Sequence, residues 1–125
     1  MFTKTDIYHY AIDGFGEFFA DPLSLRRRLL VASSGRCWEW AKQAKAYEQQ
    51  LAKLGEEDVD GRAEWSMRLA EVEGKLVDVA FQAFNLPAIE PDADGQPSGV
   101  SELAGLELMY RFLEWLDEKK GEPGS

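Results

Sequence analysis

The sequence predicts a mainly α-helical fold: a four-helix domain with an antiparallel helical hairpin and a short N-terminal β-like element. Three observations support this prediction. Apolar residues recur with the helical period from residue 22 onward. Prolines and glycines of the kind that begin and end helices separate these periodic stretches. The chain has 125 residues, 45% of them hydrophobic, which suits one core rather than two.

We therefore expect a single helical domain over residues 1–120 and a disordered tail, "GEPGS", over residues 121–125. At the N-terminus, "DIYHYAIDGFG" is rich in residues that favour strands, and its Asp13-Gly14 pair is a hairpin turn signal. A short strand or hairpin is therefore favoured over a helix. Three phenylalanines that follow are expected to fill the core: Phe15, Phe18 and Phe19.

The stretch "DPLSLRRRLLVASSG" predicts the first helix, over residues 22–33. Asp21 can accept hydrogen bonds from the first turn, Pro22 suits the first helical position, and Gly35 can take the left-handed conformation that ends a helix. The members of the basic run inside it lie about 100° apart around the helix and span about 200°, so they cannot all face one ligand. A solvated face is the expected role of these residues: Arg26, Arg27 and Arg28.

Residues 40–54 and 65–83 carry the clearest helical pattern, because apolar residues alternate at spacings of three and four in both. Two such seams predict an antiparallel pair joined by "GEEDVDGR", with Asp58 or Asp60 as the cap of the second helix. Gly74 weakens that helix, which suggests a close crossing neighbour. The residues expected inside the pair are Trp40, Tyr47, Leu51, Trp65, Leu69 and Leu76.

The last helix, "SELAGLELMYRFLEWLDEKK", is apolar on two sides, and Ser98 or Ser101 can cap it. One row contains Leu106, Met109, Leu113 and Leu116, and the other contains Leu108, Phe112 and Trp115. Aromatic residues on a helix face are frequent binding hot spots, so the second row is the candidate protein interface. The alternative is that this row completes the protein's own core.

The segment over residues 85–102 holds three of the five prolines and separates two helices, which favours a helix breaker and spacer. Part of it, "EPDADGQ", resembles a calcium loop with Gly95 at the sixth position. The closing bidentate glutamate would then fall at Ser101, which cannot supply it. We therefore expect no metal site, and no other cofactor.

Enzymatic chemistry is poorly represented in the sequence. Cys37 and His9 are the only cysteine and the only histidine, so a Cys-His nucleophile pair has one candidate and a zinc site lacks ligands. The stretch "DGFGE" lacks the remaining glycine and the lysine of a phosphate loop. We expect a non-enzymatic protein, in which Cys37 serves as a small buried residue.

The net charge of −9 opposes direct nucleic-acid binding, since phosphate neutralisation needs clustered Lys and Arg. No apolar run is long enough to cross a bilayer, and the first residues lack the layout of a signal peptide. A cytoplasmic protein without membrane contact is expected. The excess of acidic over basic residues is largest in the C-terminal third, which motivates one alternative function: an acidic inhibitor that mimics nucleic acid and occupies a basic cleft.

In size, order and hydrophobic texture, most of the chain resembles the small tail-assembly chaperones of long-tailed phages. The resemblance lies in the β-leaning start, "FADPLSLRRRLL", "KLVDVAFQAFNLP" and "GVSELAGLELMYRFLEWLDEKK". It transfers no individual functional residue. It implies a protein of the infected bacterial host's cytoplasm that holds tail subunits during virion assembly. The sequence thus predicts a protein-binding protein with a protein partner, a homo-oligomeric state, or both.

Overall fold

The computed structural model describes residues 7–12 and 15–121, with side chains up to residue 118. In chain order its elements are β1 (Tyr8–Ile12), β2 (Gly16–Ala20), α1 (Pro22–Ser33), α2 (Cys37–Lys53), α3 (Val59–Ala83), β3 (Glu90–Pro91), β4 (Pro97–Ser98) and α4 (Glu102–Gly121). The predicted mainly α fold with a short N-terminal β element is confirmed. Of the predicted tail, Gly121 is still helical, and residues 122–125 lie outside the described residues.

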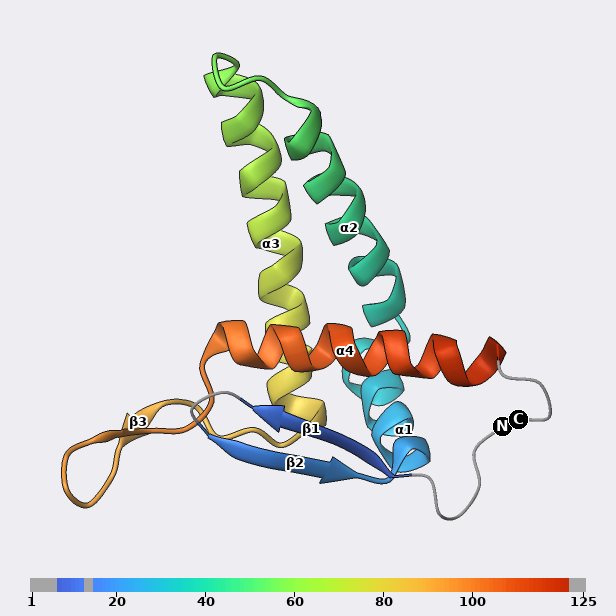
Figure 1. The fold of residues 1–125 in the computed structure, drawn as a ribbon, viewed down its shortest axis with the longest axis vertical. Helices are drawn as coiled ribbons and strands as arrows, with labels where there is room; N and C mark the ends of the chain where they lie inside the picture. The colour runs from blue at the N-terminus through green and yellow to red at the C-terminus, as the bar shows by residue number, and fades with distance from the viewer. Residues whose placement is uncertain (1–6, 13–14, 122–125) are drawn as a thin grey trace.

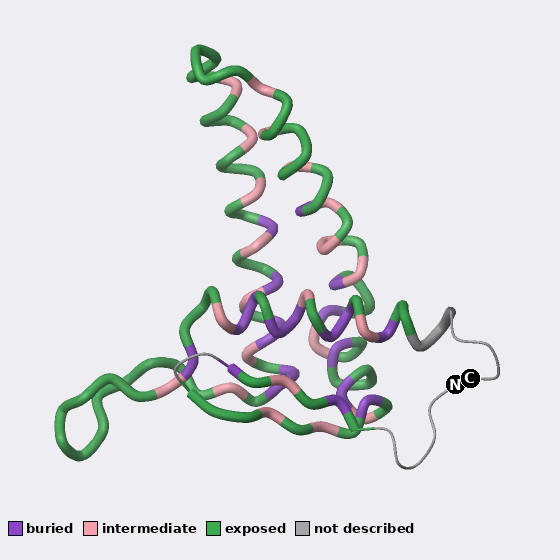
Figure 2. Tube along the Cα trace, viewed as in Figure 1, coloured by how far each residue is buried: buried purple, intermediate pink, exposed green. Residues whose placement is uncertain are grey.

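Helices α2 and α3 form an antiparallel arm that rises from a base (Figure 1). The base consists of α1, α4, the β1–β2 hairpin and the C-terminal end of α3. Fully buried residues gather in the base and the lower half of the arm (Figure 2). Between Ala44 on α2 and Val72 on α3, no residue of the arm is fully buried. The distal arm is therefore held by a half-covered seam.

The β1–β2 hairpin covers one side of α4. Its antiparallel register pairs Tyr8 with Ala20 and Tyr10 with Phe18, so the side chains on one face of the sheet point toward the core. The expectation that three phenylalanines fill the core is wrong for two of them. Phe18 is half-buried, but Phe15 and Phe19 are exposed, because residues 18 and 19 point to opposite faces of a strand. The expected turn residues, Asp13 and Gly14, lie outside the described residues.

Helix α1 has the predicted bounds, although its ends differ in detail. The Asp21 side chain makes no capping hydrogen bond. Both Ser34 and Gly35 are left-handed, with φ of 53° and 78°. The buried Ser33 hydroxyl donates to the Leu29 carbonyl at 2.7 Å and accepts from the Cys37 amide at 3.2 Å. This hydroxyl therefore links the end of α1 to the start of α2.

The arm closes as the seam pattern predicts. Asp58 caps α3 by accepting from the Gly61 amide at 3.0 Å. Near the middle of the arm, the rings of Tyr47 and Trp65 lie 5.5 Å apart. Leu76 is fully buried, and the other five residues expected inside are half-buried: Trp40, Tyr47, Leu51, Trp65 and Leu69. The seam is therefore real but is sealed only near the base.

The segment over residues 85–102 is more ordered than a spacer. Strands β3 and β4 form a short antiparallel ladder, and the Asp92 carboxylate accepts from the amides of Asp94 and Gln96 at its tip. The Val100 amide donates to the Pro87 carbonyl at 2.8 Å. At Gly99, φ is +132° and a Cβ would collide with the Ala88 backbone, so this position needs glycine. The segment forms a projecting hairpin anchored at its base.

Two searches of the described residues bear on membranes and metals. No helix among them is long and apolar enough to span a membrane. Within residues 7–12 and 15–118, no group of three or more His, Cys, Asp or Glu side chains could hold a metal ion. In the calcium-like stretch, Asp92 instead caps the turn of its own hairpin.

Candidate protein-binding surface

The predicted interface row on α4 lies against the protein's own base. Leu108 and Phe112 are both 0% exposed. The Phe112 ring is 4.9 Å from the ring of Tyr8 on β1 and 5.8 Å from that of Phe84. Trp115 is half-buried, 5.5 Å from Tyr8 and 6.1 Å from Phe112. These contacts agree with the core alternative, because a partner could reach Leu108 and Phe112 only if the hairpin moved away.

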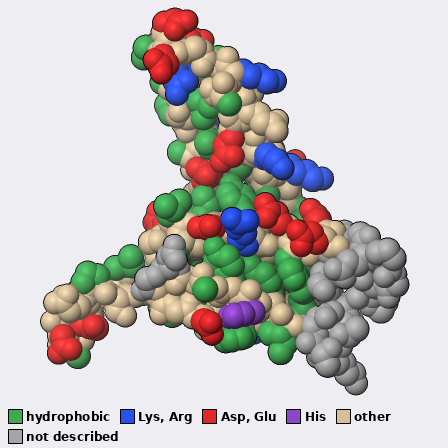
Figure 3. Space-filling view, viewed as in Figure 1, with side chains coloured by type: hydrophobic (Ala, Val, Ile, Leu, Met, Phe, Trp, Pro, Cys, Tyr) green, Lys and Arg blue, Asp and Glu red, His purple; other side chains and the backbone are tan. Residues whose placement is uncertain are grey.

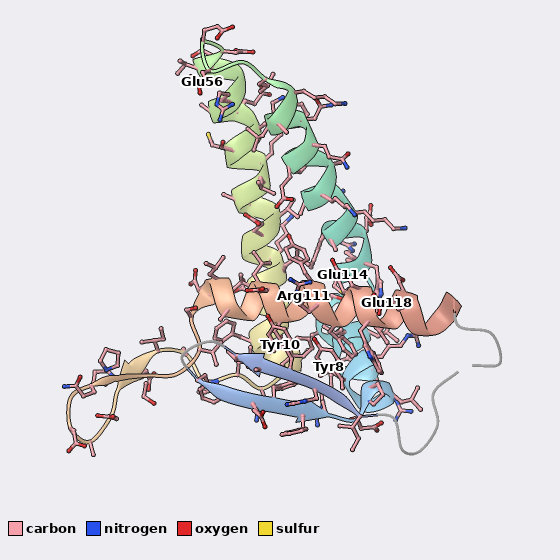
Figure 4. All side chains as sticks on the ribbon, viewed as in Figure 1. Tyr8, Tyr10, Glu56, Arg111, Glu114 and Glu118 are labelled. Atoms are coloured by element: carbon pink, nitrogen blue, oxygen red, sulfur yellow. The ribbon has the colours of Figure 1, made fainter. Side chains whose placement is uncertain are left out.

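The reason for this burial is the position of the β1–β2 hairpin, which lies below α4 (Figure 1). Figure 4 shows Tyr8 and Tyr10 beneath α4, with Arg111 and Glu114 on the helix above them. Arg111 lies 3.6 Å from Glu114 and 3.9 Å from Glu107, and all three side chains are exposed. This side of α4 therefore faces solvent. Burial also raises the pKa of Tyr8, whose hydroxyl has no hydrogen-bond partner among the described residues.

A second apolar surface lies on α3, on the side of the helix that faces away from α2. We call it the outer face, and it consists of Val59, Ala63, Met67, Ala70 and Gly74. At 100° per residue, these positions lie roughly opposite the seam residues Trp65 and Leu69. All five residues are exposed, and Met67 is 74% exposed. A long helix thus carries one apolar row toward α2 and another toward solvent.

Gly74 shows how open the outer face is. A Cβ built there would meet no atom within 4 Å, so the close crossing neighbour expected from the sequence is absent at this position. The close crossing occurs one helix away, at Gly105 of α4, where a Cβ would lie 2.6 Å from Phe81 Cε1. Gly105 therefore admits the Phe81 ring, whereas Gly74 leaves the outer face flat.

The outer face leads down into a pocket at the foot of the arm. Val77 and Phe81 continue the apolar row of α3 for two further turns. They line a pocket of ≈ 480 Å³, which we call the foot pocket; its remaining lining residues are Asp78, Ala88, Ile89, Val100, Ser101 and Glu102. The segment after α3 therefore supplies one wall of this pocket. Figure 3 shows hydrophobic side chains gathered at the foot of the arm above α4, and carboxylates at its tip.

Carboxylates follow the outer face along one side. We call this row the acidic flank; it consists of Asp60, Glu64, Glu71 and Asp78, all exposed. Their spacings of 4, 7 and 7 place them on one line along the helix. Asp78 belongs to both the acidic flank and the foot pocket, and Glu102 adds a second carboxylate to the pocket. This edge of the surface thus carries four carboxylates, one of which, Glu64, pairs with Arg68 at 2.8 Å.

A second pocket lies between α2 and α4, and its charges differ from those of the foot pocket. This pocket, of ≈ 450 Å³, carries both signs of charge, with Lys42 and Lys45 on α2 and Glu114 on α4. Burial, then the charges of Glu73 and Glu48, raise the pKa of Tyr110 to about 12. Burial and the neighbouring Glu48 likewise raise the pKa of Glu73. This pocket is therefore less selective for one sign of charge than the acidic flank.

The candidate nucleophile pair is not assembled. Cys37 is completely buried, and burial raises the pKa of its thiol, which disfavours the reactive thiolate. His9 lies on the exposed face of β1, where its ring stacks on Phe19 with centroids 4.3 Å apart and its Nε2 lies 3.4 Å from Glu17 Oε1. Cys37 therefore lies in the core and His9 lies on the surface, so the two side chains do not form a catalytic pair.

Sequence reasoning missed the outer face, although its signal is present. Val59, Ala63, Met67, Ala70 and Gly74 recur at spacings of 4, 4, 3 and 4. Small residues contribute little to an apolar pattern, so the larger seam residues of the same helix dominate it. The foot pocket could not be found this way, because residues from α3 and from the segment after it meet there only in the fold.

Comparison with known proteins does not extend this picture. No family model matches the chain, and no curated protein and no solved structure matches it either.

Proposed function

We propose that this chain is a non-enzymatic protein-binding protein that holds a helical segment of a partner against the outer face of α3. The observation that carries the proposal is the continuity of the outer face with the foot pocket. An exposed apolar helix face that ends in a pocket is the geometry of helix-in-groove recognition, in which anchors recur at helical spacing. The projecting arm makes the surface accessible along its length.

The flat, small-residue part of the outer face supports this proposal. Gly74 costs α3 about 1 kcal/mol relative to alanine, and the structure gives it no intramolecular neighbour that needs the space. A partner helix would benefit from such a position, because its backbone could approach closely. A tail-assembly chaperone, the class that the sequence resembles, would be one protein of this kind, and that assignment stays a prediction.

The alternative of an acidic inhibitor has weaker support. The carboxylates of the C-terminal third are divided between the β3–β4 hairpin and α4, and on α4 Arg111 pairs with Glu107 and Glu114. Charge mimicry would give binding that falls steeply with salt, whereas apolar docking would survive it.

The proposal is tested by selection from a displayed library of random peptides on the immobilised protein. We expect the recovered peptides to bind the wild type and to lose at least about tenfold in affinity on the Met67→Glu variant, which buries a charge in the apolar contact. Val31→Glu is the matched control, since Val31 is 76% exposed, nearly the same as Met67, but lies on α1. Recovery of no peptide above background, or equal binding to Met67→Glu, would contradict the proposal.

A further inference from the structure

We propose that the helix held by the outer face is basic: an amphipathic segment of a partner protein that carries Lys or Arg beside its apolar row. This inference rests on the proposed function and adds the chemistry of the partner.

The three cations of α3 engage groups outside the outer face, and the first of them, Arg62, donates to the Leu54 carbonyl at 3.3 Å. Arg68 lies over the Trp65 ring at 4.8 Å, and Lys75 lies over the ring of Trp40 on α2 at 5.6 Å. Arg68 also pairs with Glu64 at 2.8 Å. Lys75 therefore turns its charge toward α2, whereas Arg68 stays on its own helix and compensates one member of the acidic flank, Glu64.

The remaining carboxylates are uncompensated. Among the residues that the structure describes, no Lys, Arg or His forms an ion pair with Asp60, Glu71, Asp78 or Glu102. An apolar helix face bordered by such a row favours a partner helix with cations at the matching positions, as flanking charges do in paired helices. Exposed ion pairs are individually weak, so several together are needed to select for the sign of the partner's charge.

A second copy of this chain fits the surface less well. If two outer faces packed antiparallel about an axis at Met67, the acidic flanks of the two copies would run side by side, and Arg68 compensates only Glu64 in each of them. Like charges in facing positions are destabilising. The charge pattern therefore favours a different, basic partner over self-association.

The foot pocket adds an anchor to this description. Its apolar lining from Val77, Phe81 and Val100 suits one large apolar side chain, and its carboxylates Asp78 and Glu102 suit a neighbouring cation. The expected ligand thus has small or apolar residues along one face, one large apolar anchor toward an end, and Lys or Arg along the edge.

The test uses two synthetic peptides of about three heptads with the same apolar row, one with lysines and one with glutamates at the flanking positions. In fluorescence anisotropy at low salt, the lysine-flanked peptide should bind the wild type at least about tenfold more tightly. The double variant Glu71→Lys with Asp78→Lys should reverse this preference. The matched control, Glu39→Lys with Glu48→Lys on α2, makes the same change in net charge and should leave the preference for lysine in place.

The outcomes separate this inference from the proposed function. Equal binding of both peptides, with loss of both on Met67→Glu, would overturn the basic-partner inference and leave the outer face as a binding surface. Wild-type dimers in light scattering that Met67→Glu converts to monomers would overturn it in favour of a second copy. Absence of binding by the lysine-flanked peptide would also overturn it, and the library selection would then decide the proposed function on its own.

Discussion

Phe112 joins three elements of the base, because its ring on α4 packs against Tyr8 of β1 and Phe84 at the end of α3. These rings meet nearly edge to face, which adds to the free energy gained by burying them. The Phe112 side chain is 0% exposed. If the ring is removed, water therefore cannot take its place against these neighbours. The base of the molecule therefore depends on this one residue more than on any exposed aromatic.

The substitution Phe112→Ala should lower the free energy of unfolding by about 3–5 kcal/mol, the usual cost of a large cavity in a core. Denaturant unfolding followed by circular dichroism measures this loss. Phe19→Ala, which shortens an exposed phenylalanine of the same hairpin, is the matched control and should cost well under half as much. Similar losses for both variants would show that Phe112 is not the core anchor described here.

Glu73 gives the stability of the arm a pH dependence with a definite sign. Burial, and then Glu48, raise its pKa above the ordinary 4.5, so folding disfavours its carboxylate form. The resulting destabilisation is absent below the unfolded-state pKa and is complete above the raised folded-state pKa.

We therefore expect Glu73→Gln to raise the melting temperature at neutral pH and to have almost no effect at a pH below 4.5. Thermal unfolding of the variant and the wild type at both pH values measures the difference. Glu71→Gln removes the same charge from an exposed position of the same helix and serves as the control. A gain from Glu73→Gln that is equally large in acid would have a cause other than ionisation.

At the scale of the helix, two glycines interrupt helices of the same fold for opposite reasons. Gly105 of α4 leaves room for the Phe81 ring, whereas Gly74 of α3 faces open space. Alanine improves helix propensity by about 1 kcal/mol at either position. Only at Gly105 does the added methyl group meet a neighbouring side chain.

We expect alanine to change the stability of the protein in opposite directions at these two glycines. Gly74→Ala should stabilise the protein by up to about 1 kcal/mol, because no atom of the described residues lies within 4 Å of the added methyl group. Gly105→Ala should destabilise it by about 1–2 kcal/mol, since overpacking against Phe81 outweighs the same gain. Chemical denaturation of both variants decides the point. If Gly74→Ala were the destabilising change, α3 would have an intramolecular neighbour that this account lacks.

The helices were predictable to within a few residues because their signals are local. Asp21 and Pro22 before the first helix, and the seam from Trp65 to Leu76, act over one or a few turns. The covering of Phe112 was not predictable from pattern, since it requires residues near opposite ends of the chain to meet. The same limit applies to the foot pocket, whose walls come from α3 and the segment that follows it.

At the scale of the whole molecule, the fold separates stability from recognition. The base holds the large buried side chains (Figure 2). The arm carries the outer face, which none of the residues that the structure describes covers above the foot pocket. A surface that the protein does not need for its own core is free to be selected for a partner. The acidic flank beside it gives that partner its expected charge.

Methionine methyl resonances test recognition through the outer face most directly, because one methionine lies on that face and another lies in the core of the base. Of the three methionines, Met67 lies on the exposed outer face, Met109 is fully buried in the base, and Met1 lies outside the described residues. Titration of the ¹³C-methyl-labelled protein with the lysine-flanked peptide should shift the Met67 signal saturably while the Met109 signal stays in place. A Met67 signal that does not move at saturating peptide, or a Met109 signal that moves instead, would contradict recognition through the outer face of α3.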